Sequence, residues 1–140
     1  MRLFFDINVI LDVLAARDPW VEDSGAVLSF VDDPNVEGFL AAHSVTTLSY
    51  LVSKQLGRQE AVVVLLDLLE HLSVTALDEE LLLKALSLGW VDVEDAVQAI
   101  SAQRARADYL VTRNPADFSS FSVEVVTPSE LRALLESDAP

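Results

Sequence analysis

The sequence contains no cysteine among its 140 residues, and basic residues are scarce. Without cysteine, neither a disulfide framework nor a metal site with thiolate ligands is available. Lys and Arg number 9 against 23 Asp and Glu, which gives a formal net charge of -14 at pH 7. Nucleic-acid-binding proteins are usually basic, because neutralised phosphates supply most of their non-specific affinity. Any contact of this chain with nucleic acid is therefore expected to be local, or to use metal ions that offset the acids.

Long hydrophobic runs are also missing. No segment approaches the roughly 18 apolar residues needed to span a bilayer, and the N-terminus lacks the charged region and long apolar core of a signal peptide. We therefore expect a cytoplasmic protein with no membrane contact. Hydrophobic residues still make up 51% of the chain, and the mean hydropathy is +0.35, so disorder is not expected. We predict one domain over residues 1–135 and a frayed tail over residues 136–140.

Short apolar segments typical of β-strands alternate with helical segments along the chain. The expected strands cover residues 3–5, 36–42, 72–77, 109–112 and 123–126. The expected helices cover residues 9–16, 22–31, 45–55, 60–70, 79–88, 93–106 and 128–135. Strands that alternate with helices indicate parallel pairing. The predicted fold class is therefore α/β, a three-layer α/β/α sandwich whose central parallel sheet has about five strands.

Residues that favour helix starts mark several of these boundaries. Ser44, Asp78 and Asp92 are expected N-caps, because a short polar side chain can accept a hydrogen bond from a free backbone N–H at the start of a helix. Thr127 is followed by a proline and, three residues on, by a glutamate, which together predict another helix start. The helix over residues 60–70 is almost entirely apolar in its middle. We expect it to be buried on more than one side, in the core or against a partner subunit.

Polar side chains follow two of the expected strands where a hydrophobic core does not require them. Asp6 comes directly after the first strand, and Asn114 and Asp117 lie in the loop after the fourth. Ligands of open α/β sheets bind outside the carboxyl ends of the strands, at the point where the strand order reverses. If the first and fourth strands are neighbours there, these groups meet at one edge of the sheet. The helix before the fourth strand adds the acids at its start, which are Asp92, Glu94 and Asp95.

Several carboxylates at one edge repel one another strongly. Two unit charges about 4 Å apart cost about 4 kcal/mol at an effective dielectric constant near 20. Raised pKa values or a bound cation resolve such repulsion. Oxygen ligands without cysteine or a nearby histidine suit Mg²⁺ or Mn²⁺ better than Zn²⁺, and such an ion can activate water and stabilise charge on a phosphodiester. The alternative is purely structural, because Asp is also common as a helix cap and in turns.

Three segments of the chain together resemble the PIN domain family. They are residues 6–12 (DINVILD), 93–99 (VEDAVQA) and 111–118 (VTRNPADF). The most similar members are the bacterial single-domain VapC-type toxins and their relatives, and the resemblance extends over nearly the whole chain. It implies a metal-dependent ribonuclease with the fold predicted above.

The resemblance also implies roles for individual residues. Asp6 would be the first metal ligand, with Asp95 facing it from the start of a helix. Asn114 or Asp117 would complete the catalytic site from the last loop, and Asp117 is the expected metal ligand of the two. Asn8 would help to orient the first loop. Asp92 and Glu94 would be supporting residues, although the family usually has one acid at this helix start. Thr112 would position a ligand or simply end the strand. Arg113 would contact a phosphate or be an exposed loop residue.

The chain departs from the family at one position. The family commonly carries a glutamate about one turn into the helix that we expect to begin at Ser44, and here Thr47 occupies that place. A hydroxyl group can hold a metal-bound water but supplies no negative charge. The departure does not affect the expected fold, but it lowers the expected metal affinity and catalytic rate.

Three functions compete on this sequence. The leading one is a nuclease that cleaves RNA with Mg²⁺ or Mn²⁺ and is the toxin of a toxin–antitoxin pair. Its partner would be an antitoxin protein, and it would form a homodimer. A haloacid-dehalogenase-type phosphatase is disfavoured, because its mechanism needs an acid two residues after Asp6, where Asn8 stands. The non-enzymatic alternative is a catalytically weakened PIN module that binds another protein, favoured by Thr47 and by the acidic composition. An antitoxin segment could insert an arginine into the acidic pocket, and the helix over residues 60–70 could form the homodimer or dock that segment.

Overall fold

A parallel sheet of five strands, in the order β3-β2-β1-β4-β5, forms the centre of the structure. The structure is a computed structural model that describes residues 1–118 and 121–137. The strands are β1 (Arg2–Phe5), β2 (Glu37–Ala41), β3 (Leu72–Thr75), β4 (Tyr109–Val111) and β5 (Glu124–Val126). All neighbouring strands pair in parallel, as predicted. Since β1 lies between β2 and β4, the first and fourth strands are neighbours where the strand order reverses.

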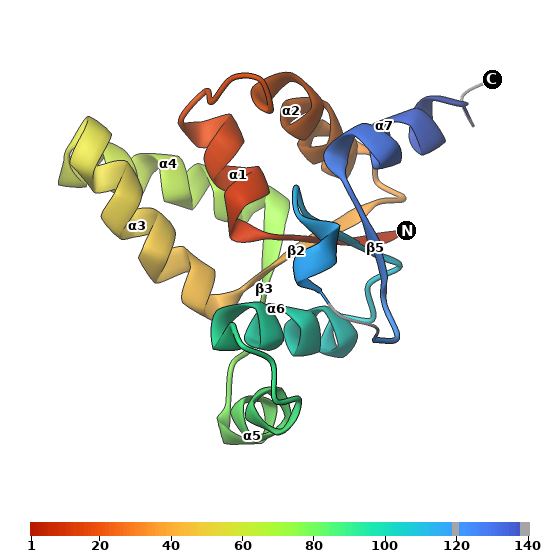
Figure 1. Ribbon diagram of the computed structural model, residues 1–140. Coiled ribbons are helices and arrows are strands. Elements are labelled where there is room, and N and C mark those ends of the chain that lie inside the picture. The colour runs from red at the N-terminus through yellow and green to blue at the C-terminus, as the bar shows by residue number, and fades with distance from the viewer. Residues whose placement is uncertain (119–120, 138–140) are drawn as a thin grey trace.

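Helices cover both faces of this sheet (Figure 1). The helices are α1 (Ile7–Leu14), α2 (Val21–Ser29), α3 (Ala42–Leu56), α4 (Arg58–His71), α5 (Glu79–Ser87), α6 (Val93–Arg104) and α7 (Pro128–Ser137), with the short 3₁₀ helices η1 (Phe30–Asp32) and η2 (Pro115–Asp117). The first four helices and α7 lie over one face, α6 covers the other, and α5 packs on the outside of α6 (Figure 1). This arrangement confirms the predicted three-layer fold class.

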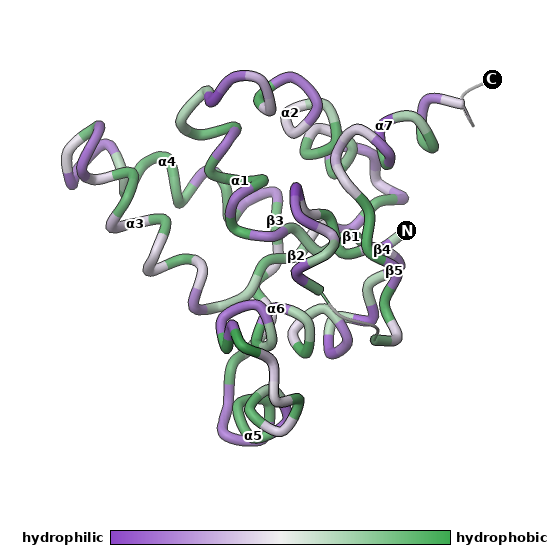
Figure 2. The backbone as a smooth tube through the Cα atoms, viewed as in Figure 1, coloured by the Kyte–Doolittle hydropathy of each residue, from purple (hydrophilic) through white to green (hydrophobic). Residues whose placement is uncertain are grey.

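The central strand β1 shows why both faces must be covered. Leu3, Phe4 and Phe5 are all fully buried. Successive side chains of a strand point to opposite faces, so Leu3 and Phe5 pack into the core beneath α1, α3 and α4, whereas Phe4 packs beneath α6. In Figure 2 the hydrophobic colour is prominent along the central strands, and hydrophilic residues mark the tip between α3 and α4. A strand buried on both faces places Asp6, its next residue, at the carboxyl edge of the sheet.

Glycine at position 38 allows β2 to pack closely. A Cβ atom at this position would lie 2.5 Å from Cδ2 of Leu72 and 2.6 Å from Cγ1 of Val31. Both separations are far below the 3.5–4.0 Å or so at which carbon atoms attract each other. The close packing of Leu72 and Val31 over β2 therefore depends on the missing side chain.

The helix starts agree with the predicted caps except at α3. The side chains of Asp78, Asp92 and Thr127 each accept a hydrogen bond from the backbone N–H three residues on, as expected for N-caps. The prediction for Ser44 was wrong. α3 begins two residues earlier, at Ala42, and Ser44 is fully buried within its first turn. The chain passes from β2 directly into α3 through two alanines, which are the best helix formers and need no polar cap to continue.

The helix expected over residues 60–70 is buried on one side only, so the expectation of wider burial in the core was wrong. α4 buries Ala61, Leu65 and Leu68 against the rest of the chain. Contact of its outer face with a partner subunit stays a prediction. The apolar side chains exposed on α4 are Val62, Val63, Leu66 and Leu69.

The C-terminal helix runs further than expected. Glu136 belongs to α7 and accepts a hydrogen bond from Nε of Arg132 at 2.9 Å, so residues 136 and 137 are helical and not frayed. Residues 138–140, where we also expected fraying, lie outside the described residues. Among the helices that the structure describes, none is long and apolar enough to cross a membrane.

Candidate active site

Asp6 is held at the end of β1 by hydrogen bonds to both of its carboxylate oxygens. Thr112 donates from Oγ1 to Oδ2 at 2.8 Å, and Gln98 donates from Nε2 to Oδ1 at 3.1 Å. The backbone N–H of Asn8 also reaches Oδ1, at 3.4 Å, which makes Asp6 the N-cap of α1. Only 4% of Asp6 is exposed. The carboxylate is therefore fixed by groups from three separate segments, so it is more than the simple helix cap that the sequence left open.

Gln98 is a functional candidate that was not predicted from the sequence. It lies in the middle of α6, is 1% exposed, and accepts a hydrogen bond from the backbone N–H of Ile7 at 3.2 Å while it donates to Asp6. A signal was present in the sequence. Gln98 is the one polar residue within the apolar run of residues 96–100, and it lies one turn beyond Asp95 on the same face of the helix.

Acids from separate segments of the chain surround Asp95. Burial, together with the negative charges of Asp92, Asp6, Asp117 and Glu94, raises the pKa of Asp95 to about 7. Asp95 lies in the first turn of α6, and the others come from the end of β1, from the start of α6 and from the loop after β4. These acids meet at the edge of the sheet where we expected them, because β1 and β4 are neighbouring strands. A cavity of about 460 Å³ opens beside these acids and is lined by Gly89, Trp90, Val91, Asp92, Asp95 and Asp117.

The loop after β4 connects to Asp6 through Thr112. The hydroxyl of Thr112 donates to Asp6 and accepts a hydrogen bond from the backbone N–H of Asn114 at 3.2 Å. The side chains of Asn114 and Asp117 are exposed, and Asp117 ends η2. The hydroxyl of Thr112 therefore links the carboxylate of Asp6 to the first turn of the loop.

Some expected site residues make other contacts. The hydroxyl of Thr47 donates to the backbone carbonyl of His43 at 3.4 Å, within its own helix. Asn8 contacts Asp6 through its backbone N–H, at the position where we expected it to orient the first loop. Glu94 is exposed. Burial of His43 lowers the pKa of its imidazole, and the negative charge of Glu94 opposes that effect. Glu94 thus lies near the first turn of α3 as well as near Asp95.

Arg113 packs against other residues of the chain, which contradicts the exposed-loop alternative, whereas its contact with a phosphate stays a prediction. Its side chain is 17% exposed, and its Nε lies 2.8 Å from Oδ2 of Asp12, a fully buried residue of α1. Its Cζ lies 3.9 Å from the centre of the Trp20 ring. Arg113 is therefore not an exposed loop residue, and its guanidinium is engaged on the α1 side of the sheet. Asp12 closes the first PIN-like segment of the sequence, but its partner could not be identified from the sequence alone.

The donors at this site fit a hard divalent cation that takes few of its ligands from the protein. Within the described residues, no group of three or more Asp, Glu or His side chains is arranged so that it could hold a metal ion by itself. Mg²⁺ is usually held by one or two carboxylates together with waters and substrate phosphates. Asp6 and Asp95 fit such a site, because they are close enough to repel each other and a cation would relieve that repulsion. They do not fit the closed cage of a structural zinc ion.

Comparison with known families identifies the PIN domain. The family model of the PIN domain matches residues 2–116. No protein among the curated sequences matches the chain.

Solved structures share the fold at low sequence identity. VapBC-1 from nontypeable Haemophilus influenzae is 16% identical with a TM-score of 0.71, and the match covers 92% of this chain and 99% of that one. A toxin–antitoxin complex from Klebsiella pneumoniae is 20% identical with a TM-score of 0.69, covering 90% and 97%. VapBC2 from Rickettsia felis, bound to a DNA fragment from its promoter, is 16% identical with a TM-score of 0.66, covering 91% and 98%. These likenesses support the same fold for this chain.

Proposed function

This chain belongs to the PIN domain family, and on that premise we propose that it is a metal-dependent ribonuclease, the toxin of a toxin–antitoxin pair, acting on RNA in the cytoplasm. The observation that carries the proposal is that Gln98, one turn beyond Asp95 on α6, hydrogen-bonds to Asp6, while Asp95 and Asp117 line one cavity. The charges of Asp6 and Asp117 also help to raise the pKa of Asp95. Acidic residues that meet at the carboxyl edge of a parallel sheet suit a divalent cation and a phosphodiester substrate. The toxin assignment is supported by the toxin–antitoxin complexes among the structures of similar fold.

Different residues take different parts of the chemistry. Asp6 and Asp95, with Asp117 nearby, would hold Mg²⁺ or Mn²⁺, and the bound ion would supply activation of water and stabilisation of charge on the phosphodiester. Gln98 and Thr112 each donate to one oxygen of Asp6, which fixes the carboxylate and leaves further lone pairs for a ligand. At neutral pH Asp95 is close to its pKa, and a bound cation would favour its charged form.

A second function has some support. A weakened PIN module that acts only by binding another protein is favoured by Thr47, whose hydroxyl bonds to its own helix and adds no charge to the site. The formal net charge of -14 also suits a basic protein partner better than free RNA.

Cleavage of single-stranded RNA separates the two functions. We would compare the wild type with Asp6→Asn, which keeps the shape of the side chain and removes its charge, with and without Mn²⁺. The matched control is Asp78→Asn, because Asp78 is an exposed N-cap of α5 outside the acidic site. The nuclease proposal expects Mn²⁺-dependent cleavage by the wild type and the control, and at least about a 100-fold loss in Asp6→Asn. Equal, metal-independent traces from all three proteins would leave only the binding function.

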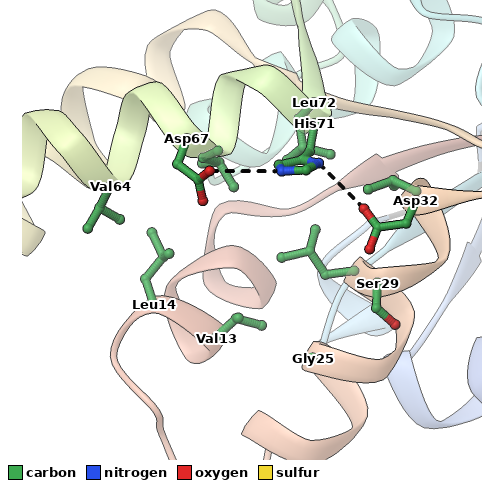
Figure 3. A pocket seen from close by; sticks show the side chains of 12 residues that line it. Val13, Leu14, Gly25, Ser29, Asp32, Val64, Asp67, His71 and Leu72 are labelled. Atoms are coloured by element: carbon green, nitrogen blue, oxygen red, sulfur yellow. Dashed lines mark ion pairs between the residues drawn. The ribbon is translucent and has the colours of Figure 1, made fainter.

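A groove away from the acidic site suits the antitoxin partner. It has a volume of about 340 Å³ and lies between α1, α2 and α4, with Val13, Leu14 and Val64 on its walls (Figure 3). Its rim is acidic, and a histidine bridges two carboxylates there: Nδ1 of His71 lies 3.4 Å from Asp32, and Nε2 lies 3.9 Å from Asp67 (Figure 3). An apolar groove with acidic residues at the rim complements an amphipathic helix that carries Lys or Arg. We propose that the antitoxin docks such a helix here.

Calorimetric titration with a basic amphipathic helical peptide, which represents the proposed antitoxin segment, tests this docking. Val64→Asp places a charge within the groove and is expected to weaken binding by at least about tenfold. Leu86→Asp is the matched control, because Leu86 is 58% exposed on α5 and lines neither the groove nor the outer face of α4. Equal losses in the two variants would contradict docking in the groove.

The outer face of α4 is the candidate homodimer contact. Its apolar side chains Val62, Val63, Leu66 and Leu69 are 36–62% exposed. We propose that a second copy covers this face. Light scattering is expected to show a dimer for the wild type and a monomer for Leu66→Glu. A wild-type monomer at high protein concentration would contradict the proposal.

A further inference from the structure

Asp12 is a buried acid outside the set of acids around Asp95. It lies on α1, six residues beyond Asp6, and is fully buried. Oδ2 of Asp12 lies 2.8 Å from Nε of Arg113, and Oδ1 lies 3.8 Å from Nη1 of Arg17. The contact with Arg113 joins two residues that are far apart in the sequence. It ties the helix that Asp6 caps to the loop that follows β4.

Asp12 depends on this arginine. A buried carboxylate is costly unless a cation compensates it, and removal of one partner leaves the other charge buried and uncompensated. The N–H of Arg113 does not point at the oxygen, so among the described residues Asp12 has an ionic partner but no hydrogen bond to its side chain. Burial raises the pKa of Asp12, and Arg113 and Arg17 oppose this effect. The ring of Trp20 also limits the freedom of the guanidinium, because its centre lies 3.9 Å from Cζ.

The loop between Arg113 and Phe118 is held at both of its ends. Arg113 is anchored on the face of the sheet that α1 covers. Phe118 is 6% exposed and packs edge-on against Trp90, at a ring separation of 6.2 Å, in the core beneath α6. The two exposed candidates for the active site, Asn114 and Asp117, lie between these anchors.

We propose that Asp12 and Arg113 form a positioning pair that holds the loop carrying Asn114 and Asp117 beside Asp6 and Asp95. The role given to the loop rests on the proposed nuclease function, whereas the restraint on the loop does not. Neither residue of the pair touches the reacting atoms. A direct contact of Arg113 with RNA is the competing role, and the geometry disfavours it because the side chain is 17% exposed and lies against Asp12 and Trp20.

Hydrogen exchange of the metal-free protein tests whether the pair restrains the loop, and this measurement does not depend on enzymatic activity. The amides of Asp117 and Phe118 report on it, because they bond to Asn114 and Pro115 within η2. Asp12→Asn and Arg113→Met are each expected to speed their exchange by about tenfold or more, relative to the amides of β4. Normalisation to β4 separates loosening of the loop from a general loss of stability.

Two further variants sharpen this measurement. Arg113→Lys keeps the positive charge and is expected to restore exchange to within about threefold of the wild type. Asp78→Asn is the matched control, since it breaks an exposed ion pair with Arg104 of 3.0 Å and is expected to leave the loop unchanged. Unchanged exchange in Asp12→Asn and Arg113→Met overturns the proposal, and so does an Arg113→Lys variant that exchanges as fast as Arg113→Met.

Titration with Mn²⁺ and RNA then tests what the restraint achieves. Asp12→Asn is expected to bind Mn²⁺ about tenfold more weakly and to lower kcat with little change in KM. A rise in KM alone for Arg113→Met, with normal loop exchange, would instead indicate a direct RNA contact and overturn the proposal. If the wild type neither binds Mn²⁺ nor cleaves RNA, the nuclease function fails, and the exchange data still decide whether the pair holds the loop.

Discussion

Gln98 and Asp6 are joined across 92 residues of sequence by a buried hydrogen bond of 3.1 Å. The same side-chain amide also accepts the backbone N–H of Ile7. One glutamine of α6 therefore fixes both the acid at the end of β1 and the first residue of α1. Because Gln98 carries no charge, it can do this without adding to the repulsion among the acids.

Gln98→Leu tests this relationship. The variant leaves Oδ1 of Asp6 without its side-chain donor and the N–H of Ile7 without its acceptor, so we expect a loss of about 1–3 kcal/mol in the free energy of unfolding. RNA cleavage is expected to fall by about 10–100-fold. Gln103→Leu, at a less buried position on the same helix where Gln103 bonds to Ser122, is the control. Equal stability of the two variants would contradict the role of Gln98.

The raised pKa of Asp95 predicts how stability depends on pH. Between the ordinary value of 3.8 and the folded value of about 7, the folded chain keeps a proton that the unfolded chain has lost. The contribution of Asp95 to stability is therefore present at acidic pH and is lost as the pH rises toward 7. Urea unfolding at about pH 5 and about pH 8 should show a smaller fall for Asp95→Asn than for the wild type.

Asp78 provides a control of opposite sign for this measurement. Hydrogen bonds from Arg104 and from the backbone of Leu81 lower its pKa. Its contribution is present at neutral pH and is lost as the pH falls through the lowered value. Asp78→Asn should therefore flatten the acid side of the stability profile and leave the slope between about pH 5 and about pH 8 unchanged. Identical profiles for all three proteins would contradict the raised pKa of Asp95.

Thr47→Glu tests whether the departure from the family weakens the site. The substitution supplies the acid that PIN domains commonly carry there, so we expect tighter Mn²⁺ binding, by about tenfold, and faster RNA cleavage. Thr46→Glu is the matched control, because Thr46 is exposed and its hydroxyl bonds to the same carbonyl of His43. Isothermal titration with Mn²⁺ provides the comparison. An equal gain in both variants would show only a general effect of added negative charge.

Gly38→Ala is expected to destabilise the protein. The added Cβ would lie 2.5 Å from Cδ2 of Leu72 and 2.6 Å from Cγ1 of Val31, so these side chains must move, and we expect a loss of about 1–3 kcal/mol. Gly25 is the matched control, because it is helical and nothing lies within 4 Å of the position that an added Cβ would take. Gly25→Ala should stabilise the chain by about 0.5–1 kcal/mol. Urea unfolding measures both, and a stable Gly38→Ala would contradict the close packing.

The sequence was sufficient for the order of elements because hydrophobic period and turn residues are local signals. All five strands and the parallel fold class follow from them. The start of α3 could not be predicted in this way, because the two alanines between β2 and α3 include no polar N-cap residue. The acids Asp6 and Asp95 could be found because Asp6 directly follows a strand and Asp95 lies in the first turn of a helix. The partners Gln98 and Arg113 are fixed by contacts with residues far away in the sequence, and no local pattern encodes which distant group a buried side chain will meet.

The placement of β1 has a consequence for the order in which the protein becomes active during synthesis. β1 is made first, but one of its neighbours, β4, pairs Tyr109 with Leu3, more than 100 residues later. Until that strand has left the ribosome, Asp6 lacks Thr112 as a donor and Asp117 is absent from the site. On the proposed function, a nascent chain cannot cut the messenger that encodes it until nearly all of the chain has been translated. Stalled chains that end at residue 104 are expected to show no cleavage of added RNA.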